Sequence, residues 1–238
     1  MAHDGRIRGG GVCALMLVAT PAVVAQSFNV DFNVGGPGVW SGAPLSGWSA
    51  AAGQPGLWNE VDATFKNDKA SLISLDDDAD PVTLRWTNRP GSVQTASVST
   101  INQGNYARLM NDAVAFSGPG LTYTFEFDGL KLGRYQVFTY AGNILDETES
   151  LVIVTGSEDG VARQIQSPPT PGRLIEGMSH AVHDVNSWNG TIRVQIIALT
   201  PGVEVFGFQV RYIPAPGALV AVPGLGFVLL ARRRRGVH

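Results

Sequence analysis

Cysteine is almost missing from this chain of 238 residues, which has only Cys13. Because this residue falls in the N-terminal apolar segment, the rest of the chain offers no disulfide, no thiol nucleophile and no cysteine ligand for zinc. The apolar runs near the two ends are each shorter than the about 20 residues that an ordinary membrane-spanning helix needs. A hydrophobic core must therefore stabilise the main part of the chain without covalent help.

Basic residues are scarce in the middle of the chain. The whole sequence has 17 lysines and arginines against 20 aspartates and glutamates. Without Asp4, Arg6, Arg8 and Arg232–Arg235 near the ends, residues 26–212 hold 11 basic and 19 acidic residues, a formal charge of −8. An acidic surface repels phosphate backbones, which argues against nucleic-acid binding.

The first 25 residues have the three parts of a secretory signal peptide. Arg6 and Arg8 form a basic start, Val12–Thr20 is the apolar segment, and small residues lead up to Ala25. We expect cleavage between Ala25 and Gln26, with export of the chain from Gln26 onward. A retained N-terminal anchor is the alternative, although the apolar segment is short for one.

The C-terminal segment, residues 213–238, combines a proline motif, an uncharged apolar stretch and an arginine cluster. The apolar stretch, Gly217–Ala231, would span roughly 22 Å as a hydrophobic helix at about 1.5 Å per residue, less than a bilayer core. The pattern favours a sorting tail that is read and removed, over a permanent anchor or a buried core helix. Its signal residues are Pro214, Ala215, Pro216, Arg232, Arg233, Arg234 and Arg235.

This tail resembles the PEP-CTERM sorting signal of Gram-negative bacteria that make extracellular polysaccharide. Ala215 stands where that signal has glutamate, as in Pro-Ala-Pro variants of the tail. The resemblance implies an exosortase-type membrane protease and the secretion machinery as partners. It also implies a transient or retained inner-membrane anchor and a final location at the cell surface or in the extracellular matrix.

The middle of the chain, residues 26–212, has the alternation of a β domain. Apolar and polar residues alternate with period two in Leu121–Phe127. Tyr135–Tyr140 comes after a turn that contains Gly129 and Gly133, so the sequence predicts a hairpin.

A first strand is predicted at Phe28–Phe32 and a last one at Phe206–Tyr212, which Pro214 would stop. We expect these two strands to be neighbours in space. Further strands are predicted at Leu72–Leu75, Val82–Thr87, Val93–Val98, Leu151–Thr155, Val161–Gln166 and Ile192–Ile196, and a helical turn near Tyr106–Asp112. The expected fold is all-β, a jelly-roll β-sandwich with an N-terminal signal peptide and a short C-terminal hydrophobic helix.

Four segments of the middle part resemble exported jelly-roll domains related to galactose-binding-like folds. They are Phe28–Phe32, Gly56–Asn59, Leu109–Asp112 and Leu130–Tyr140. The resemblance is spread over most of residues 26–212 and implies a fold more than an activity.

Residues 35–56 form a segment that is longer than the about 12–15 residues of an ordinary loop, and such loops are often functional. Trp40 and Trp48 lie in it, and Trp58 comes just after it. An indole face can stack on the apolar face of a sugar ring, so these tryptophans are candidates for glycan contact. The alternative is that they pin the loop to the sandwich.

Asp76, Asp78 and Asp80 have the alternate spacing of the carboxylates that begin a calcium loop. The rest of the pattern differs, because Pro81 stands where such loops have glycine and Thr87 where they have glutamate. The cluster therefore predicts either a calcium site or a solvated turn between strands.

The usual catalytic patterns do not stand out. His180 and His183 would point to opposite faces of a strand and would not share a metal. Glu126 and Asp128 would share a face, as glycosidase carboxylates do, but such pairs are common on exposed strands. Asn189–Thr191 matches a glycosylation triplet, although Asn-Gly favours a turn. We identify no Ser-His-Asp order, phosphate loop or dinucleotide fingerprint.

Two functions from different classes remain. The first is an exported, non-enzymatic protein of the cell surface or extracellular matrix that associates with polysaccharide, as in a biofilm. The second is a glycan-active hydrolase or lyase on the same scaffold. Convergent carboxylates about 5–10 Å apart in a cleft would favour the enzyme. A shallow, aromatic-lined surface would favour binding.

Overall fold

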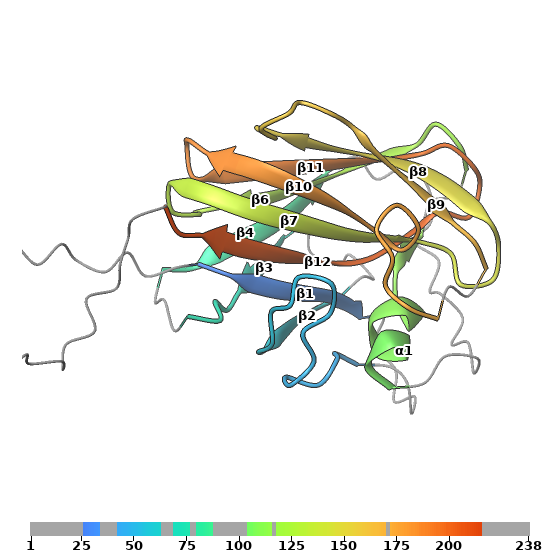
Figure 1. Cartoon of the computed structure of the whole chain (residues 1–238), viewed down its shortest axis with the longest axis horizontal. Coiled ribbons are helices and arrows are strands. Elements are labelled where there is room, and N and C mark those ends of the chain that lie inside the picture. The colour runs from blue at the N-terminus through green and yellow to red at the C-terminus, as the bar shows by residue number, and fades with distance from the viewer. Residues whose placement is uncertain are drawn as a thin grey trace, which may run out of the picture. The chain divides into compact units, whose positions relative to one another are not determined.

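The computed structural model describes residues 26–33, 42–62, 69–76, 80–87, 104–115, 118–169 and 172–215. The predicted leader, most of the predicted tail and the strand predicted at Val93–Val98 lie outside these ranges. The described residues form two packed β-sheets and one helix (Figure 1). Within these ranges, no helix is both long enough and apolar enough to cross a membrane.

The first sheet, sheet A, brings the first and last described strands together. β1 (Phe28–Asn33) pairs antiparallel with β12 (Glu204–Ile213), as predicted, and β12 ends directly before Pro214. Figure 1 shows β10, β7, β12 and β1 side by side. The order is β10 (His180–Ser187), β7 (Gly133–Gly142), β12, β1 and β2 (Trp58–Asp62), and β5 (Val114–Ala115) pairs with the start of β12.

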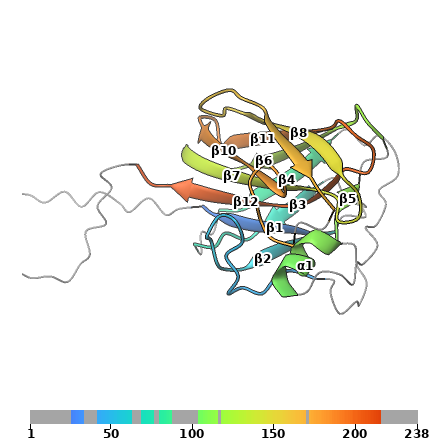
Figure 2. The same ribbon diagram turned by 45° about the vertical axis from the view of Figure 1, so that its right-hand side comes forward.

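The second sheet, sheet B, lies against the first (Figure 2). Its order is β3 (Lys69–Leu72), β4 (Val82–Thr87), β6 (Thr122–Asp128), β11 (Thr191–Ala198), β8 (Thr148–Thr155) and β9 (Arg163–Ser167). From β6 onward the chain passes repeatedly from one sheet to the other, with β7, β10 and β12 in sheet A and β8, β9 and β11 in sheet B. This winding makes the domain a jelly-roll β-sandwich, as the sequence predicted.

The main core lies between the two sheets and is rich in aromatic rings. Phe32 of β1, Phe125 of β6 and Phe208 of β12 are fully buried there. The ring of Phe125 lies 5.4 Å from that of Phe32 and 5.1 Å from that of Phe208, between ring centroids. The apolar alternation of these strands therefore supplies one shared interior, as period-two strands do.

β6 and β7 do not form the hairpin that the sequence predicted. β6 pairs with β4 and β11 in sheet B, whereas β7 pairs with β10 and β12 in sheet A. The prediction was wrong because alternation shows which side of a strand is apolar, not which strand lies beside it. Phe125 and Val137 both face the main core, so the turn between β6 and β7 carries the chain across the sandwich.

A second, smaller core lies on the outer face of sheet A. The segment at residues 42–57 and the helix α1 (Gly104–Asn111) cover part of that face, and α1 confirms the helical turn predicted near Tyr106–Asp112. We call this core the outer cluster; its buried residues are Ala52, Trp58, Leu109, Met110, Ala113, Phe138, Tyr140, Ile144 and Phe206. Sheet A is therefore apolar on both faces, while sheet B presents polar side chains on its outer face.

Candidate functional site

The outer face of sheet B carries a shallow polar groove. Its volume is about 410 Å³, and three adjacent strands, β4, β6 and β11, line it. Side chains alternate along β6. Phe125 and Phe127 therefore enter the core, while Thr124 and Glu126 face outward. The lining residues are Arg85, Thr87, Thr124, Glu126, Arg193 and Gln195.

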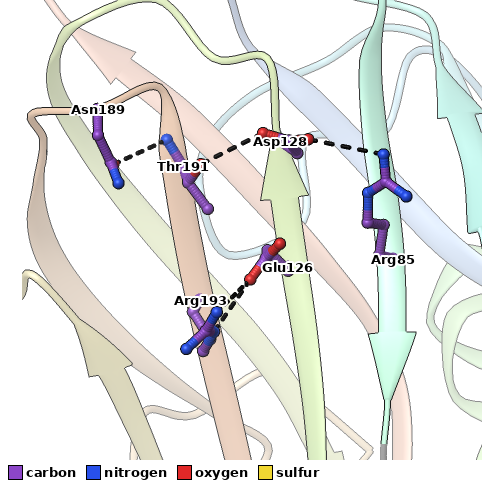
Figure 3. Close-up of polar contacts among 6 residues, drawn as sticks. All are labelled: Arg85, Glu126, Asp128, Asn189, Thr191 and Arg193. Carbon is purple, nitrogen blue, oxygen red and sulfur yellow. Dashed lines mark hydrogen bonds and ion pairs between the residues drawn. The ribbon is translucent and has the colours of Figure 1, made fainter.

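A row of charged side chains crosses the groove. Glu126 of β6 lies opposite Arg85 of β4 on one side and opposite Arg193 of β11 on the other. Arg193 donates from Nε and Nη2 to Oε2 of Glu126, at 3.0 Å and 2.6 Å (Figure 3). The Arg193 side chain keeps 51 % of its surface exposed, so the pair is held in place yet open to solvent.

A second polar row lies beside the first, at the end of the strands. Asp128 pairs with Arg85 at 3.7 Å and accepts a 3.3 Å hydrogen bond from the Thr191 hydroxyl. The Thr191 amide in turn donates to Oδ1 of Asn189 at 3.2 Å (Figure 3). Asn189 and Gly190 therefore form the turn that the sequence favoured, with Gly190 at a φ of 80°.

The two carboxylates of this face do not have the surroundings of a glycosidase pair. Glu126 and Asp128 are outward neighbours on one strand, and each forms an ion pair with an arginine. A general acid needs an apolar pocket that keeps its carboxyl group protonated, whereas Glu126 lines a solvent-open, polar groove and Asp128, whose side chain is 46 % exposed, lies beside that groove. The groove offers carboxylate, guanidinium, amide and hydroxyl groups, which can form hydrogen bonds with the hydroxyl groups of a ligand.

The tryptophans of the predicted glycan site do not form an exposed aromatic surface in the described part of the chain. Trp40 lies outside the described residues. Trp58 is only 4 % exposed and belongs to the outer cluster. Trp48 stacks on it, with ring centroids 5.8 Å apart and an interplanar angle of 24°. This burial favours the role of pinning the loop to the sandwich over contact of Trp58 with a sugar ring.

Buried amides hold the same loop on sheet A. The Ala52 amide donates to Oε1 of Gln209 at 3.0 Å, and Nε2 of Gln209 donates to Oδ1 of Asn29 at 2.8 Å. Gln54 also donates to Oδ1 of Asn29, at 2.9 Å. Because Asn29 and Gln209 are fully buried, these bonds satisfy polar groups that would otherwise destabilise the fold. The described part of the long segment is thus a structural cover.

The aspartate cluster is described only in part. Oδ2 of Asp76 accepts a 3.2 Å hydrogen bond from the Ser27 amide, and Asp80 lies two residues before β4, while Asp78 lies outside the described residues. In the part of the chain that the structure describes, no three His, Cys, Asp or Glu side chains gather as metal ligands. The calcium prediction for Asp76, Asp78 and Asp80 stays a prediction.

His180 and His183 lie on opposite faces of β10, as their spacing predicted. His180 packs beside Tyr140 of the outer cluster, with ring centroids 5.7 Å apart, and burial lowers its pKa to about 4. His183 is 1 % exposed on the other face, where burial also lowers its pKa. Both histidines are therefore neutral at pH 7, and they do not share a metal.

Three carboxyl groups that the sequence did not single out lie close together beside β1. Asp31 is fully buried, and within the described part of the chain neither of its oxygens has a hydrogen-bond partner. Burial raises the pKa of Asp31 well above its usual value, and the charges of Asp112 and Glu60 raise it further. Burial raises the pKa of Asp112 as well. From the alternation of Phe28–Asn33 one could predict that Asp31 faces away from the main core. The sequence does not show that Asp112, which directly follows α1, lies near Asp31.

A second groove, of about 460 Å³, lies where β7 and β10 meet the connection between β8 and β9. Arg134 pairs there with Glu158 at 2.8 Å, and Arg163 pairs with Asp159. Four acidic residues line this groove against a single arginine: Glu158, Asp159, Glu176 and Asp184, with Arg163. Its charged residues are thus mostly of one sign, unlike the balanced groove of sheet B.

One end of the sandwich carries two exposed apolar side chains. Trp188, in the turn between β10 and β11, is 78 % exposed, and Leu132, in the turn between β6 and β7, is 64 % exposed. The Leu130 amide donates to the Gly190 carbonyl at 2.8 Å, so the two turns lie together. A tryptophan inside an Asn-Gly turn is the sequence signal that could have drawn attention to this end.

The predicted processing sites lie at that same end. Gln26 is bonded to the turn that contains Leu132, because the Lys131 amide donates to Oε1 of Gln26 at 2.6 Å. Pro214 and Ala215 are exposed and directly follow β12. The other residues of the predicted signals, namely Ala25, Pro216, Arg232, Arg233, Arg234 and Arg235, lie outside the described residues.

No protein-family model and no curated protein matches this chain. Among solved structures, a family 35 carbohydrate-binding module from Clostridium thermocellum is 14 % identical at a TM-score of 0.36, over 55 % of this chain and 92 % of that one. Such a module from Cellvibrio japonicus is 17 % identical at a TM-score of 0.31, over 54 % and 91 % of the two chains.

The solved structures also include enzymes. A ruminal endo-β-1,4-mannanase is 15 % identical at a TM-score of 0.34, over 53 % of this chain but only 24 % of the enzyme. The chain thus spans about a quarter of the mannanase's length. By their names, these neighbours are carbohydrate-binding modules and a glycan-degrading enzyme. Likeness at such low identities and TM-scores carries no argument about what this chain binds.

Proposed function

We propose that this protein is exported to the cell surface or extracellular matrix and binds polysaccharide there without cleaving it, through the groove of sheet B. The main support is the groove itself, where six polar side chains from three adjacent strands face one solvent-open surface. Sugar hydroxyls both donate and accept hydrogen bonds, and the groove offers guanidinium, carboxylate, amide and hydroxyl groups that match them. A glycan chain lying across the strands would meet several of these groups at once.

The pairing within the groove supports binding because it reduces the entropy lost on contact. Arg193 is held by Glu126 through two hydrogen bonds to the same oxygen, Oε2. Oε1 of Glu126 and Nη1 of Arg193 take no part in these two bonds, so they can contact a ligand in the groove. Groups that are ordered before the ligand arrives lose less rotamer freedom when it binds.

The charge of the domain favours neutral over polyanionic glycans. Residues 26–212 carry a formal charge of −8, which repels a polyanion at long range. Within the groove, two arginines face one glutamate, with Asp128 beside them, so the local charge is nearly balanced. A neutral polysaccharide would gain the hydrogen bonds without this repulsion.

The sorting tail is the second part of the proposal. The support is the order of its sequence, in which a proline motif, an uncharged apolar stretch and four arginines follow one another. The exposed Pro214 and Ala215 directly after β12 also leave the motif open to a processing enzyme. An exosortase-type protease and the secretion machinery would be the partners, with the membrane a partner at least until the tail is cut.

A retention experiment tests the binding face. The mature protein and the double variant Arg85→Ala/Gln195→Ala would be run through gels that contain extracted neutral matrix polysaccharide. We expect the variant to lose at least about tenfold in affinity, which is about 1.4 kcal/mol. Arg134→Ala is the matched control, because Arg134 also pairs with a carboxylate, Glu158, but belongs to sheet A.

Two results would overturn the proposal. In the first, the double variant keeps its circular dichroism spectrum and is retained as strongly as the wild type. In the second, the wild type releases reducing sugar from the polysaccharide and Glu126→Gln abolishes that release. The second result would establish the hydrolase or lyase instead, with Glu126 as a catalytic residue.

A further inference from the structure

Gln26 is tied into the sandwich by both its side chain and its neighbour. Its Oε1 accepts a short 2.6 Å hydrogen bond from the Lys131 amide. Ser27, the next residue, donates from its amide to Asp76 at 3.2 Å, accepts the Leu75 amide at its carbonyl at 2.8 Å, and accepts the Tyr212 amide at its hydroxyl at 3.2 Å. These bonds fix the position of Gln26 at the start of the domain.

The other half of the Gln26 amide is not satisfied. In the full chain the residue is fully buried, and its Nε2 has no hydrogen-bond partner among the residues that the structure describes. A buried polar group without a partner destabilises the folded state, because it has lost its hydrogen bonds to water. In glutamine at this position, the amide oxygen is therefore hydrogen-bonded while the amide nitrogen is not.

We propose that Gln26, once cleavage after Ala25 makes it the first residue, cyclises to pyroglutamate. The free α-amine attacks Cδ of its own side chain, a new C–N bond closes a five-membered lactam, and the Cδ–Nε2 bond breaks. Nε2 leaves as ammonia with protons from the amine, so no oxidant or other reactant is needed. This inference rests on the export step of the proposed function.

The contacts of Gln26 favour the cyclic form. Ring closure keeps the side-chain oxygen, which remains an acceptor for the Lys131 amide. It removes Nε2, the one group of this side chain without a partner.

Mass spectrometry of the exported protein tests the inference directly. The chain would be expressed with its own leader in an exporting host, and the N-terminal peptide sequenced by fragmentation. We expect a peptide that begins at residue 26 and is lighter than its glutamine form by one ammonia. Gln26→Asn is the matched control, because asparagine keeps the amide but would need a strained four-membered ring.

A stability measurement separates this effect from ordinary glutamine chemistry. Ion exchange resolves the cyclised form from the open form, because they differ by one positive charge. We expect the cyclised form to melt at the higher temperature, since it has lost an unsatisfied buried donor. Equal midpoints would show that the pocket does not favour the ring and would overturn that part of the inference.

The outcomes distinguish this inference from the proposed function. An N-terminus at residue 26 with an intact glutamine overturns cyclisation and leaves export standing. An N-terminus at another residue overturns cyclisation and moves the cleavage site. A peptide that still begins at Met1 overturns both.

Discussion

Asp31 has the least favourable surroundings of the acidic residues described beside β1. Its carboxyl group is fully buried and has no hydrogen-bond partner, and Asp112 and Glu60 add like charges nearby. Each of these conditions favours the protonated form, so the folded state holds this proton more tightly than the unfolded chain does. Asp31 therefore contributes most to stability at acidic pH.

The variant Asp31→Asn tests this pH dependence. The stabilising contribution of a raised pKa is full below the unfolded value, about 3.9, and is lost as the pH rises toward the folded value. Asparagine cannot ionise, so we expect the variant to gain stability over the wild type between pH 4 and pH 8. A gain of at least about 1.4 kcal/mol at pH 8 corresponds to one unit of pKa shift.

Denaturant titrations at the two pH values would measure the difference. Glu147→Gln is a suitable control, because it makes the same change from carboxyl to amide at an exposed position outside β1. If Asp31→Asn and the wild type lost stability in parallel from pH 4 to pH 8, the cause would have to lie in other groups. Glu204 is one such group, since burial raises its pKa to about 7.

The two tryptophans at the extremes of exposure give opposite expectations. Trp58 is 4 % exposed within the outer cluster, so Trp58→Ala should cost about 3 to 5 kcal/mol of folding free energy. Trp188 is 78 % exposed, so Trp188→Ala should change stability by less than about 0.5 kcal/mol. Chemical denaturation of both variants checks the pair. A stable Trp58→Ala would argue that the indole is there for a ligand and not for the loop.

At the scale of elements, the contact between β12 and β1 depends on Gly207. β12 has an irregular register between Val205 and Gly207, and a β-carbon added at Gly207 would lie 2.1 Å from the Val30 carbonyl oxygen. The Val30 carbonyl and the Gly207 backbone belong to paired strands, so neither can rotate to make room for the β-carbon. A side chain at this position must therefore push two central strands apart.

The variant Gly207→Ala should accordingly destabilise the domain by at least about 2 kcal/mol. Gly53→Ala is a useful comparison, because its β-carbon would meet no atom within 4 Å, although its φ of 64° carries a strain of its own. The melting temperatures of the two variants measure which substitution destabilises the domain more. A Gly207→Ala protein no less stable than Gly53→Ala would mean that the strands are not packed this closely.

The sequence was informative about strand faces and uninformative about strand neighbours. β4 was predicted with its bounds, and the first and last strands were found because Phe28–Phe32 and Phe206–Tyr212 alternate clearly. Their pairing was also correct, but it was expected from the type of fold and not from the alternation. The hairpin between β6 and β7 was wrong, because an inward Phe125 or Val137 is equally compatible with a partner beside it or across the core. β2 was missed, since it is short and runs parallel to β1.

The candidate site could be predicted only in fragments. Glu126 and Asp128 were recognised as sharing a face, but their partners Arg193 and Arg85 come from strands far away in sequence. Outward polar residues such as Thr124 and Gln195 occur on every half-exposed strand and give no signal until the strands are assembled. The groove is a product of register, which the sequence does not show.

At the scale of the whole molecule, the prediction concerns its two ends. If the leader is a secretory signal peptide and the tail is a sorting signal, protein isolated from its native host should lack residues 1–25 and the residues beyond the proline motif. Intact-mass measurement of surface material checks both ends at once. Replacing Arg232–Arg235 with glutamine should leave the tail uncut and the protein at the inner membrane, whereas Arg173→Gln, at an exposed position within the domain, should change nothing.

A pulling force on the C-terminal tail would reach the rest of the protein through β12. This strand lies between β7 and β1, pairs with β7 from Glu204 to Ile213 and with β1 from Gly207 to Val210, and the chain leaves it directly at Pro214. Tension applied beyond Pro214 runs along the strand axis and loads both rows of bonds in shear, all together. Such a strand resists mechanical extraction far better than an edge strand, whose bonds would peel apart in sequence.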